Sequence, residues 1–332
     1  MDQHRRQILI ALSALSGVSG ASVATTALAQ SAAPWPTKPI RYIVPFAAGG
    51  TTDILARVVG EKLGQALGQT IVIDNKPGQG GSAGVAELAR AAPDGYTIGG
   101  GTISSHAINA TLYAKLPYDP VASFEPITLY ATQPNVLLAH PSVPATNLRQ
   151  LIDLLKAQPE KYAYGSAGNG TSQHISGELF KSQAGVQMQH VPYRGSGPMI
   201  TELLGGTLPL AMDNIATAVQ HIKSGKLRAF AVTTAQRSGV AADVPTMAES
   251  GLPGFELSSW QAVFAPAGTP KPIIDRLYTE IARILKMPDV QKKLSDMGLD
   301  LSGMPPTELA ALVKADVIRL GKVVKDSGAR AE

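Results

Sequence analysis

The sequence predicts an α/β protein with mainly parallel sheets, in which a second α/β unit is inserted into the first. Two observations predict this: short β-rich runs alternate with amphipathic helical stretches, and one long extended run breaks the alternation. The length of 332 residues agrees, because domains usually hold about 100–200 residues.

The first unit begins with three strands separated by two helices. The stretch 51–67 is predicted to be helical because its apolar residues recur at three-four spacing. The strands are expected at Ile40–Phe46, Thr70–Asp74 and Tyr96–Ile103, and the helices at Thr51–Leu67 and Ser82–Ala92.

The run Phe124–His140 interrupts this rhythm. Proline lacks the N–H that a sheet ladder needs, so Gln133-Pro134-Asn135 argues against one continuous central strand. We expect two strands joined by a short connector, where the chain leaves one domain for the other.

The alternation then resumes in the second unit and ends in a helical region. Strands are expected at Tyr162–Gly165, Gln187–Tyr193, Leu208–Asp213, Leu227–Thr234 and Ser259–Pro266, with helices at Thr171–Ala184, Gly197–Leu204 and Ile215–Ser224. After Pro266 only helices are expected, at Pro272–Lys286, Asp289–Met297 and Thr307–Lys325, and these return to the first domain.

Residues 1–29 have the three parts of a secretory signal peptide. His4, Arg5 and Arg6 precede an apolar stretch, and Ala27-Leu28-Ala29 supplies a small-x-small cleavage site. We expect cleavage near Ala29 and export; the alternative is a buried N-terminal helix.

Composition excludes several classes of function. The 29 Lys and Arg against 25 Asp and Glu give a net charge of only +4, and no basic run exceeds two residues, which argues against a nucleic-acid surface. Cysteine is absent, which excludes disulfides, thiolate metal sites and a cysteine nucleophile.

Polar, glycine-rich loops stand where strands are followed by helices, the position at which α/β sheets bind ligands. In the first loop, Gly49 and Gly50 allow close approach of a ligand, and Thr51 or Thr52 can cap the helix. Asp53 falls in the first helical turn, where a structural acid is an equally good interpretation.

Four more loops share this character. Residues 165–174 (GSAGNGTSQH) combine glycines, hydroxyls and an amide before a helix, which suits a small anion. Arg194 can meet a carboxylate or form a surface ion pair, and His174 can face a ligand or the core. With Asp213-Asn214 and residues 99–106, these loops suggest one shared cleft.

Two motif matches are better explained as turns. Gly78–Ala83 fits a dinucleotide fingerprint, but no acidic residue follows at the required distance. Ser82 lies in G-x-S-x-G, yet it comes eight residues after Asp74 rather than directly after the strand. A secreted hydrolase using Ser82 remains an alternative.

A series of motifs in fixed order resembles one family. These are WPTKPIRYIVPFAAGGTTDILAR, VIDNKPGQGGSAG, PDGYTI, LPYDP, YGSAGNGTSQH, VPYRGSGP, AMDN, GKLRAFAVTTAQRS, DVPTMAESGLPGFE and WQAVFAPAGTP. Over essentially the whole chain after the signal peptide, the sequence is similar to the exported substrate-binding proteins of tripartite tricarboxylate transporters, the Bug/TctC group.

The resemblance implies a type II periplasmic binding protein fold: two doubly wound α/β domains, two crossovers and a central ligand cleft closed by hinge bending. The crossovers fall near Gln133–Leu138 and Phe255–Ser259. The domains implied are 30–136 and 257–332 for the first and 137–256 for the second.

The resemblance also implies the site and its ligand, a di- or tricarboxylate, acidic amino acid or aromatic acid. The expected ligand-binding residues are Phe46, Ala48, Gly49, Gly50, Thr52, Asp53, Thr102, Ser104, Ser105, Gly168, Asn169, Gly170, Thr171, His174, Tyr193, Arg194, Asp213 and Asn214. The implied partner is a membrane permease, and the implied location is the periplasm.

We expect a monomer without catalytic residues, metal or cofactor. A receptor subunit that reports ligand occupancy to a signalling system uses the same site and stays open as an alternative. The sequence leaves the identity of the ligand open.

Overall fold

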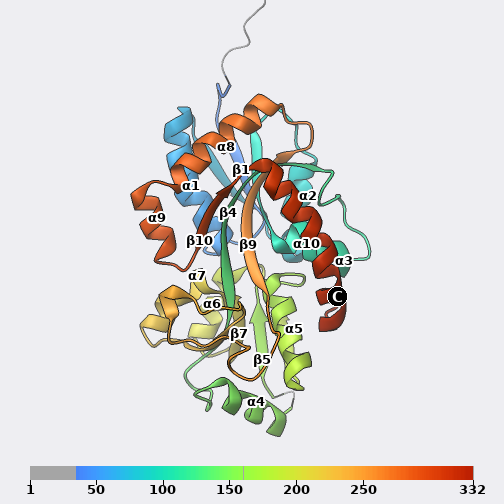
Figure 1. Ribbon diagram of the computed structural model, residues 1–332, viewed down its shortest axis with the longest axis vertical. Coiled ribbons are helices and arrows are strands. Elements are labelled where there is room, and N and C mark those ends of the chain that lie inside the picture. The colour runs from blue at the N-terminus through green and yellow to red at the C-terminus, as the bar shows by residue number, and fades with distance from the viewer. Residues whose placement is uncertain (1–34, 160, 332) are drawn as a thin grey trace, which may run out of the picture. The chain divides into compact units, whose positions relative to one another are not determined.

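Two long antiparallel strands, β4 (Phe124–Ala139) and β9 (Ser258–Pro266), form the centre of the fold (Figure 1). The computed structural model describes residues 35–159 and 161–331. The predicted signal peptide and its cleavage near Ala29 lie outside the described residues.

The other strands extend from this pair on both sides. They are β1 (Ile40–Val44), β2 (Ile71–Asn75), β3 (Thr97–Thr102), β5 (Ala163–Ser166), β6 (Gln189–Pro192), β7 (Leu210–Asn214), β8 (Arg228–Val232) and β10 (Asp300–Met304). The order is β2-β1-β3-β9-β4-β7-β5-β6, and β8 and β10 also pair with β4.

The prediction of a mainly parallel sheet is only half right. The βαβ units are parallel as expected, in the pairs β1·β2, β1·β3, β5·β6 and β5·β7. Every pairing of β4 and β9 is antiparallel, including β3·β9, β4·β7, β4·β8 and β4·β10. Alternation of strands and helices predicts parallel neighbours, whereas β9 returns to the first unit after the second and runs antiparallel to both β3 and β4.

The expected break at Pro134 is wrong, because β4 is one strand of 16 residues. Pro134 pairs with Ser258, the first residue of β9, and the next residue, Asn135, pairs with Asn214 of β7. The proline therefore lies where β4 changes partners, and its missing N–H interrupts neither ladder.

A strand in the C-terminal region was not expected. β10 (Asp300–Met304) lies in the sequence between two of the C-terminal helices, and it pairs with β4. Its sequence, DLSGM, contains residues that are rare in strands, so its conformation depends on the pairing with β4 rather than on local propensity.

The helices agree closely with the sequence. They are α1 (Thr51–Leu67), α2 (Ser82–Ala89), α3 (Asn109–Leu112), α4 (Leu148–Ala157), α5 (Ser172–Ala184), α6 (Ser196–Leu204), α7 (Ile215–Lys223), α8 (Lys271–Leu285), α9 (Pro288–Ser295) and α10 (Pro306–Ser327), with short turns at Gln79–Gly81, Ser104–Ile108 and Gly239–Ala241. α1 begins and ends where predicted, while α3 and α4 were not anticipated.

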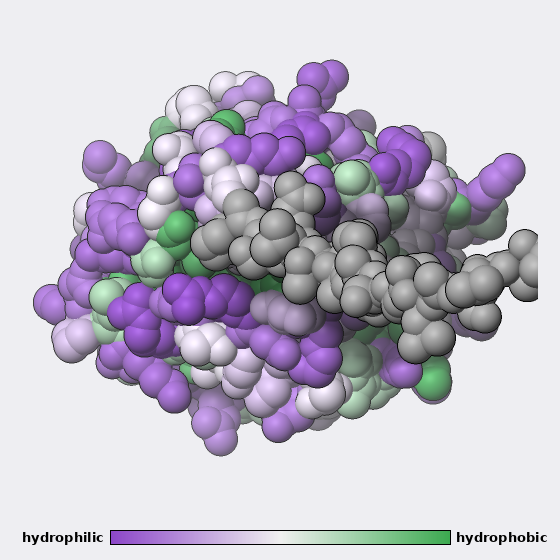
Figure 2. Space-filling model, turned by 90° about the horizontal axis from the view of Figure 1, so that it is seen from above, coloured by the Kyte–Doolittle hydropathy of each residue, from purple (hydrophilic) through white to green (hydrophobic). Residues whose placement is uncertain are grey.

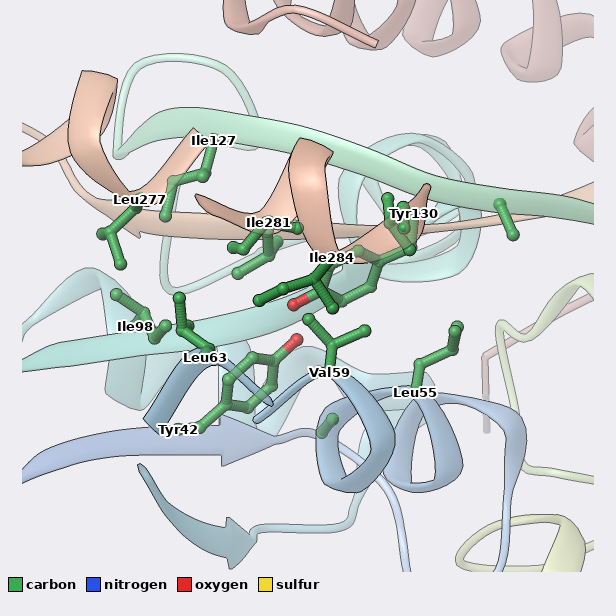
Figure 3. Packing of buried hydrophobic residues seen from close by; sticks show 14 of the residues in the cluster. Tyr42, Leu55, Val59, Leu63, Ile98, Ile127, Tyr130, Leu277, Ile281 and Ile284 are labelled. Carbon is green, nitrogen blue, oxygen red and sulfur yellow. The ribbon is translucent and has the colours of Figure 1, made fainter. Parts of the chain in front are cut away.

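Helices cover both faces of each part of the sheet, which is the doubly wound arrangement. In β1, Tyr42 belongs to the cluster that includes residues of α1 and α8, while its neighbour Ile43 belongs to the cluster that includes residues of α2 and α10. Figure 3 shows the first of these clusters, in which Val59 of α1 and Ile284 of α8 point toward each other. In β4, Leu137 and Leu138 likewise face two different clusters. Because successive side chains of a strand point to opposite faces of the sheet, each strand contributes to a separate hydrophobic core on either side.

The two predicted domains correspond to a change of partners along β4. Its residues 124–134 pair with β9 and β10, and its residues 135–139 pair with β7 and β8. The chain from Trp35 onward nevertheless groups into one unit by its contacts. The boundaries at 136/137 and 256/257 stay a prediction.

The surface of the described residues is mainly hydrophilic where Figure 2 shows it, with apolar residues scattered between charged ones. Within the part of the chain that the structure describes, none of the helices has the length and apolar character needed to span a membrane.

Candidate ligand-binding site

Four helices begin around one polar cavity near the strands β4 and β9. The first turns of α1, α5, α6 and α7 contribute to its wall through Thr51, Ser172, Ser196 and the N-cap Asn214. Its empty space is about 330 Å³, counted to where it opens to solvent. Of this space, only enough for about one water molecule is clear of the walls, so a small ligand can enter only when the cavity opens.

The first turn of α1 presents unpaired donors to the cavity. Its N-cap, Gly50, makes no side-chain capping bond, so the N–H groups of this turn lack the usual acceptor. The Nδ2 of Asn214 donates to the Thr51 hydroxyl over 3.3 Å, which leaves the proton of that hydroxyl for another partner. Thr52 donates to Oε1 of Gln261 over 2.7 Å, so the Gln261 amide N–H₂ remains available.

The start of α5 is fixed by two hydrogen bonds. Thr171 caps its own helix by accepting from the His174 N–H over 3.2 Å. The Ser172 N–H donates to Oγ of Ser104 over 3.0 Å, which joins residues from the two predicted domains. Thr171 therefore stabilises the start of α5, whereas Ser104 and Ser172 line the polar cavity.

Asp213 lies one hydrogen bond behind the cavity wall. It is fully buried and accepts from the hydroxyls of Ser196 over 2.5 Å and Thr217 over 2.6 Å. Burial raises the pKa of Asp213 to about 6, against the lowering effect of these hydrogen bonds. Because the carboxylate can only accept, it fixes the Ser196 hydroxyl proton away from the cavity.

The lining contains no charged side chain among the described residues. Hydroxyls, amides and helix N-termini form its polar part, and Phe46 and Ala167 its apolar part. An anion here would be neutralised by helix dipoles and neutral donors rather than by an ion pair, as in other anion sites at helix N-termini.

The structure brings six of the predicted residues to this cavity. They are Phe46, Gly50, Thr52, Thr102, Ser104 and Asn214. Gly168, Asn169, Tyr193 and Arg194 line a separate hollow beside it, and His174 lines a third. The remaining predicted residues line neither the polar cavity nor the hollow beside it; they are Ala48, Gly49, Asp53, Ser105, Gly170, Thr171 and Asp213.

Asp53 organises the first loop, which is the structural alternative raised from the sequence. Its carboxylate accepts from the Gly49 N–H, from Asn75 and from Arg57, each over 3.0 Å. Burial acts to raise the pKa of Asp53, but the bonds from Arg57, Gly49 and Asn75 hold it below the usual value. The charged carboxylate thus shapes the loop that carries Gly50 and Thr51.

His174 also has a structural setting. Its Nδ1 accepts from the Gly170 N–H over 3.2 Å, and its ring stacks on His190 with centroids 4.1 Å apart. Burial lowers the pKa of His174 to about 4, so the ring is neutral at pH 7. In the same way, Ser105 bonds to the backbone of Thr102 and to the buried His106.

Seven lining residues are absent from the expected set, although four of them (Thr51, Ala167, Ser172 and Gln173) lie in loops that the sequence predicts as parts of a site. The seven are Thr51, Ala167, Ser172, Gln173, Ser196, Ser259 and Gln261. A signal existed for β9, because Ser259 and Gln261 are alternate polar positions on either side of Trp260, and the strand is apolar from Ala262 onward. Their shared face follows from the two-residue period of strands.

Ser82 lacks the partner that a nucleophile needs. It is buried, its Oγ accepts from Nδ2 of Asn109 over 2.8 Å, and it lies 3.0 Å from the Tyr118 hydroxyl. No histidine within the described residues bonds to it. Its contacts hold the turn before α2 in place.

This fold, with a polar cavity at the helix N-termini between two α/β parts, is that of a periplasmic solute-binding protein, and the predicted type II fold is confirmed by the solved structures it resembles. The chain belongs to the tripartite tricarboxylate transporter family receptor group, TctC, whose family model matches residues 55–329. The resemblance found in the motifs is thereby confirmed.

Three relatives illustrate the match. Protein BugT of Bordetella pertussis is 35% identical over 90% of this chain and 92% of its own. An R. palustris protein solved with adipate is 38% identical, with TM-score 0.86, over 89% of this chain and 99% of that chain. MatC from Rhodopseudomonas palustris, solved with bound malate, is 34% identical, with TM-score 0.84, over 87% of this chain and 100% of that chain.

Proposed function

We propose that this protein captures a small carboxylate in the polar cavity by hinge closure and delivers it to the membrane permease of a tripartite tricarboxylate transporter, without itself catalysing a reaction. One observation carries the proposal: helix N-termini converge on a small cavity that has hydrogen-bond donors and no charged lining. The family is a receptor family, and two relatives were solved with carboxylates.

The energetics suit reversible capture. Each helix N-terminus favours an anion by about 0.3–1 kcal/mol, and hydrogen bonds to a charged group add about 1.5–3 kcal/mol each. A few such contacts reach about −8 kcal/mol, which corresponds to micromolar affinity. A receptor that must release its ligand to a permease needs affinity of this order.

Contacts between the two predicted domains, beside the polar cavity, support closure as the binding step. The Ala47 N–H donates to the Arg194 carbonyl over 3.0 Å, and the Tyr113 hydroxyl donates to the Asn169 carbonyl over 3.1 Å. Each of these bonds joins a residue of the first predicted domain to one of the second. Hinge motion would break and remake them without repacking either core.

The experiment is a thermal-shift screen of the protein beginning at Gln30, unfolded and refolded to remove bound ligand. The panel holds succinate, malate, adipate, citrate, aspartate, glutamate and benzoate, each beside its neutral amide. A ligand at 100 times its Kd adds about 2.7 kcal/mol, which raises Tm by several degrees. Stabilisation by at least one acid and not by its amide is expected; equal stabilisation by both would contradict a carboxylate site.

Delivery needs a separate measurement. Deleting the gene from its own cells should abolish uptake of the radiolabelled acid that binds, and restoring it should recover uptake. If uptake is unchanged and a transcriptional response to the acid is lost instead, the protein is a receptor subunit of a signalling system.

The Ser82→Ala variant should keep full ligand binding, because this side chain is outside the cavity.

A further inference from the structure

The two crossover strands separate at the boundary between the predicted domains. β4 and β9 lie side by side in the first domain (Figure 1), and the last residues that they pair are Pro134 and Ser258. Pro134 has no N–H to donate, and from Asn135 onward β4 pairs with β7 and β8 instead of β9. The direct ladder between the crossovers therefore ends where the chain passes from one domain to the other.

Thr233 connects the two crossovers at this point. It is fully buried and directly follows strand β8. Its hydroxyl accepts from the Asn135 N–H over 3.0 Å and donates to the Leu257 carbonyl over 2.6 Å. Its backbone makes both connections again, because the Thr233 N–H donates to the Asn135 carbonyl and the Leu257 N–H donates to the Thr233 carbonyl, each over 2.9 Å. One residue of the second predicted domain thus binds the ends of both crossovers.

The hydroxyl of Thr233 depends on the spacing of the two strands. It has one proton to donate, and the Leu257 carbonyl at 2.6 Å is nearer than the Asn135 carbonyl at 3.3 Å. A lone pair of the same oxygen accepts from the Asn135 N–H. Both bonds form only while the crossovers keep this distance from each other, so the side chain holds them in register.

The side chain of Asn135 extends this connection to the wall of the polar cavity. Its Nδ2 donates to Oγ of Ser176 over 3.0 Å, and its Oδ1 lies 3.4 Å from the Ser172 hydroxyl. Both serines belong to α5, and Ser172 lines the cavity. A shift at the start of α5 therefore acts on Asn135 through two contacts, and through Asn135 on Thr233.

We infer that Thr233 is the pivot of the closing motion, a positioning residue that holds the two crossovers together while the domains turn. Hinges absorb a rotation at a few residues, and a shared partner between two hinge strands restricts the rotation to fewer orientations. Fewer orientations in the open state lower the entropy that is lost on binding. This inference rests on the proposed function, since it requires that closure accompanies binding.

The test compares Thr233→Val with Thr233→Ser in the protein beginning at Gln30. The probe is the tightest binder among succinate, malate, adipate, citrate, aspartate, glutamate and benzoate. Calorimetry gives its Kd, and X-ray scattering gives the decrease in radius of gyration when it is added. Valine keeps the shape but lacks the hydroxyl, so Kd should rise about tenfold or more and the decrease should shrink by about half or more. Serine keeps the hydroxyl and should stay within about threefold of the wild-type Kd.

Thr128→Val is the matched control for an effect on stability alone. Thr128 is also fully buried, and its hydroxyl donates to the Met304 carbonyl over 2.7 Å within the first predicted domain. This variant should lower the urea midpoint of unfolding as Thr233→Val does. Its Kd and its compaction with the probe should stay as in wild type, because Thr128 joins no crossover to the second domain.

Thr233→Ala and Thr233→Ser repeat the comparison if the valine variant does not fold, because these two differ only in the hydroxyl. Wild-type Kd and compaction in the variant without the hydroxyl would overturn the pivot and leave the proposed binding function intact. Equal losses of affinity and compaction in Thr128→Val would overturn it as well. If none of the seven acids binds to wild type, the proposed function fails and the pivot fails with it.

Discussion

The hydroxyl of Ser196 donates to Oδ1 of Asp213 over 2.5 Å, and this bond connects the cavity wall to a fully buried carboxylate. Ser196 opens α6 and Asp213 is the second-last residue of strand β7, so the bond also fixes two elements relative to each other. Among the described residues, no positively charged side chain forms an ion pair with Asp213. Its hydrogen bonds from the Ser196 and Thr217 hydroxyls partly replace the water that the carboxylate loses on burial.

Asp213→Asn should change how stability depends on pH. Burial raises the pKa of Asp213 to about 6 in the folded protein, above its unfolded value of 3.8. The folded state therefore holds the proton more firmly, and stability contributed by this group is lost as pH rises from about 4 to about 6, by an amount on the order of 3 kcal/mol. Between pH 4.5 and 7.5, the wild-type free energy of unfolding should fall relative to that of the variant.

Urea unfolding of both proteins at these two pH values measures the difference. Asp300→Asn, an exposed position on β10, is the control and should follow wild type. The same difference between wild type and Asp213→Asn at both pH values would show that Asp213 keeps an ordinary pKa.

Thr51→Val should weaken carboxylate binding about tenfold or more, because a hydrogen bond from a hydroxyl to a charged group contributes about 1.5–3 kcal/mol. Valine keeps the shape but removes the hydroxyl that accepts from Asn214 and is free to donate to the ligand. Calorimetric titration with the acid identified in the screen measures the loss. Thr279→Val on α8, whose hydroxyl donates to the Asp275 carbonyl of its own helix, is the matched control. An equal Kd for the two variants would argue against donation by Thr51.

Gly197→Ala should impair closure. A Cβ at residue 197 would lie 2.3 Å from the Ala48 carbonyl oxygen, so the loop before α1 and the start of α6 could not meet. Affinity should fall at least tenfold, and the radius of gyration from X-ray scattering should no longer decrease when ligand is added. Gly239→Ala, where a Cβ meets nothing within 4 Å, serves as control. Normal compaction of the Gly197→Ala protein with ligand would refute the steric argument.

Trp260→Phe should lower stability while leaving the binding face of β9 in place. The indole Nε1–H donates to Oδ2 of Asp316 over 2.8 Å, and both residues are buried. Losing this bond leaves part of a buried carboxylate unpaired, at a cost of about 1–3 kcal/mol. Denaturant unfolding measures the change, with Tyr278→Phe on the partly buried face of α8 as control. A loss of ligand affinity larger than the loss of stability would show that Trp260 acts on the site instead.

The local pattern of apolar residues, glycines and prolines predicted most of the individual helices and strands. α1 was located at both ends because Gly50 and Gly68 flank an uninterrupted helical periodicity. The loops before α1 and α5, which the sequence predicts as parts of a site, contribute residues to the wall of the polar cavity, and their role in binding a ligand stays a prediction. Asp53 and His174 were placed on the correct loops, but their contacts show roles within the loops rather than on the cavity wall.

The sequence by itself determined the α/β class, the family and the polar character of the loops, because periodicity and motifs are carried by residues close together in the chain. Tertiary structure decided that β4 continues through Pro134, that β10 exists, and which residues form the wall of the polar cavity. Thr52 meets Gln261 across 209 positions, and Ser104 meets Ser172 across 68. Such contacts form only when distant strands pair, so no local pattern of either segment contains them.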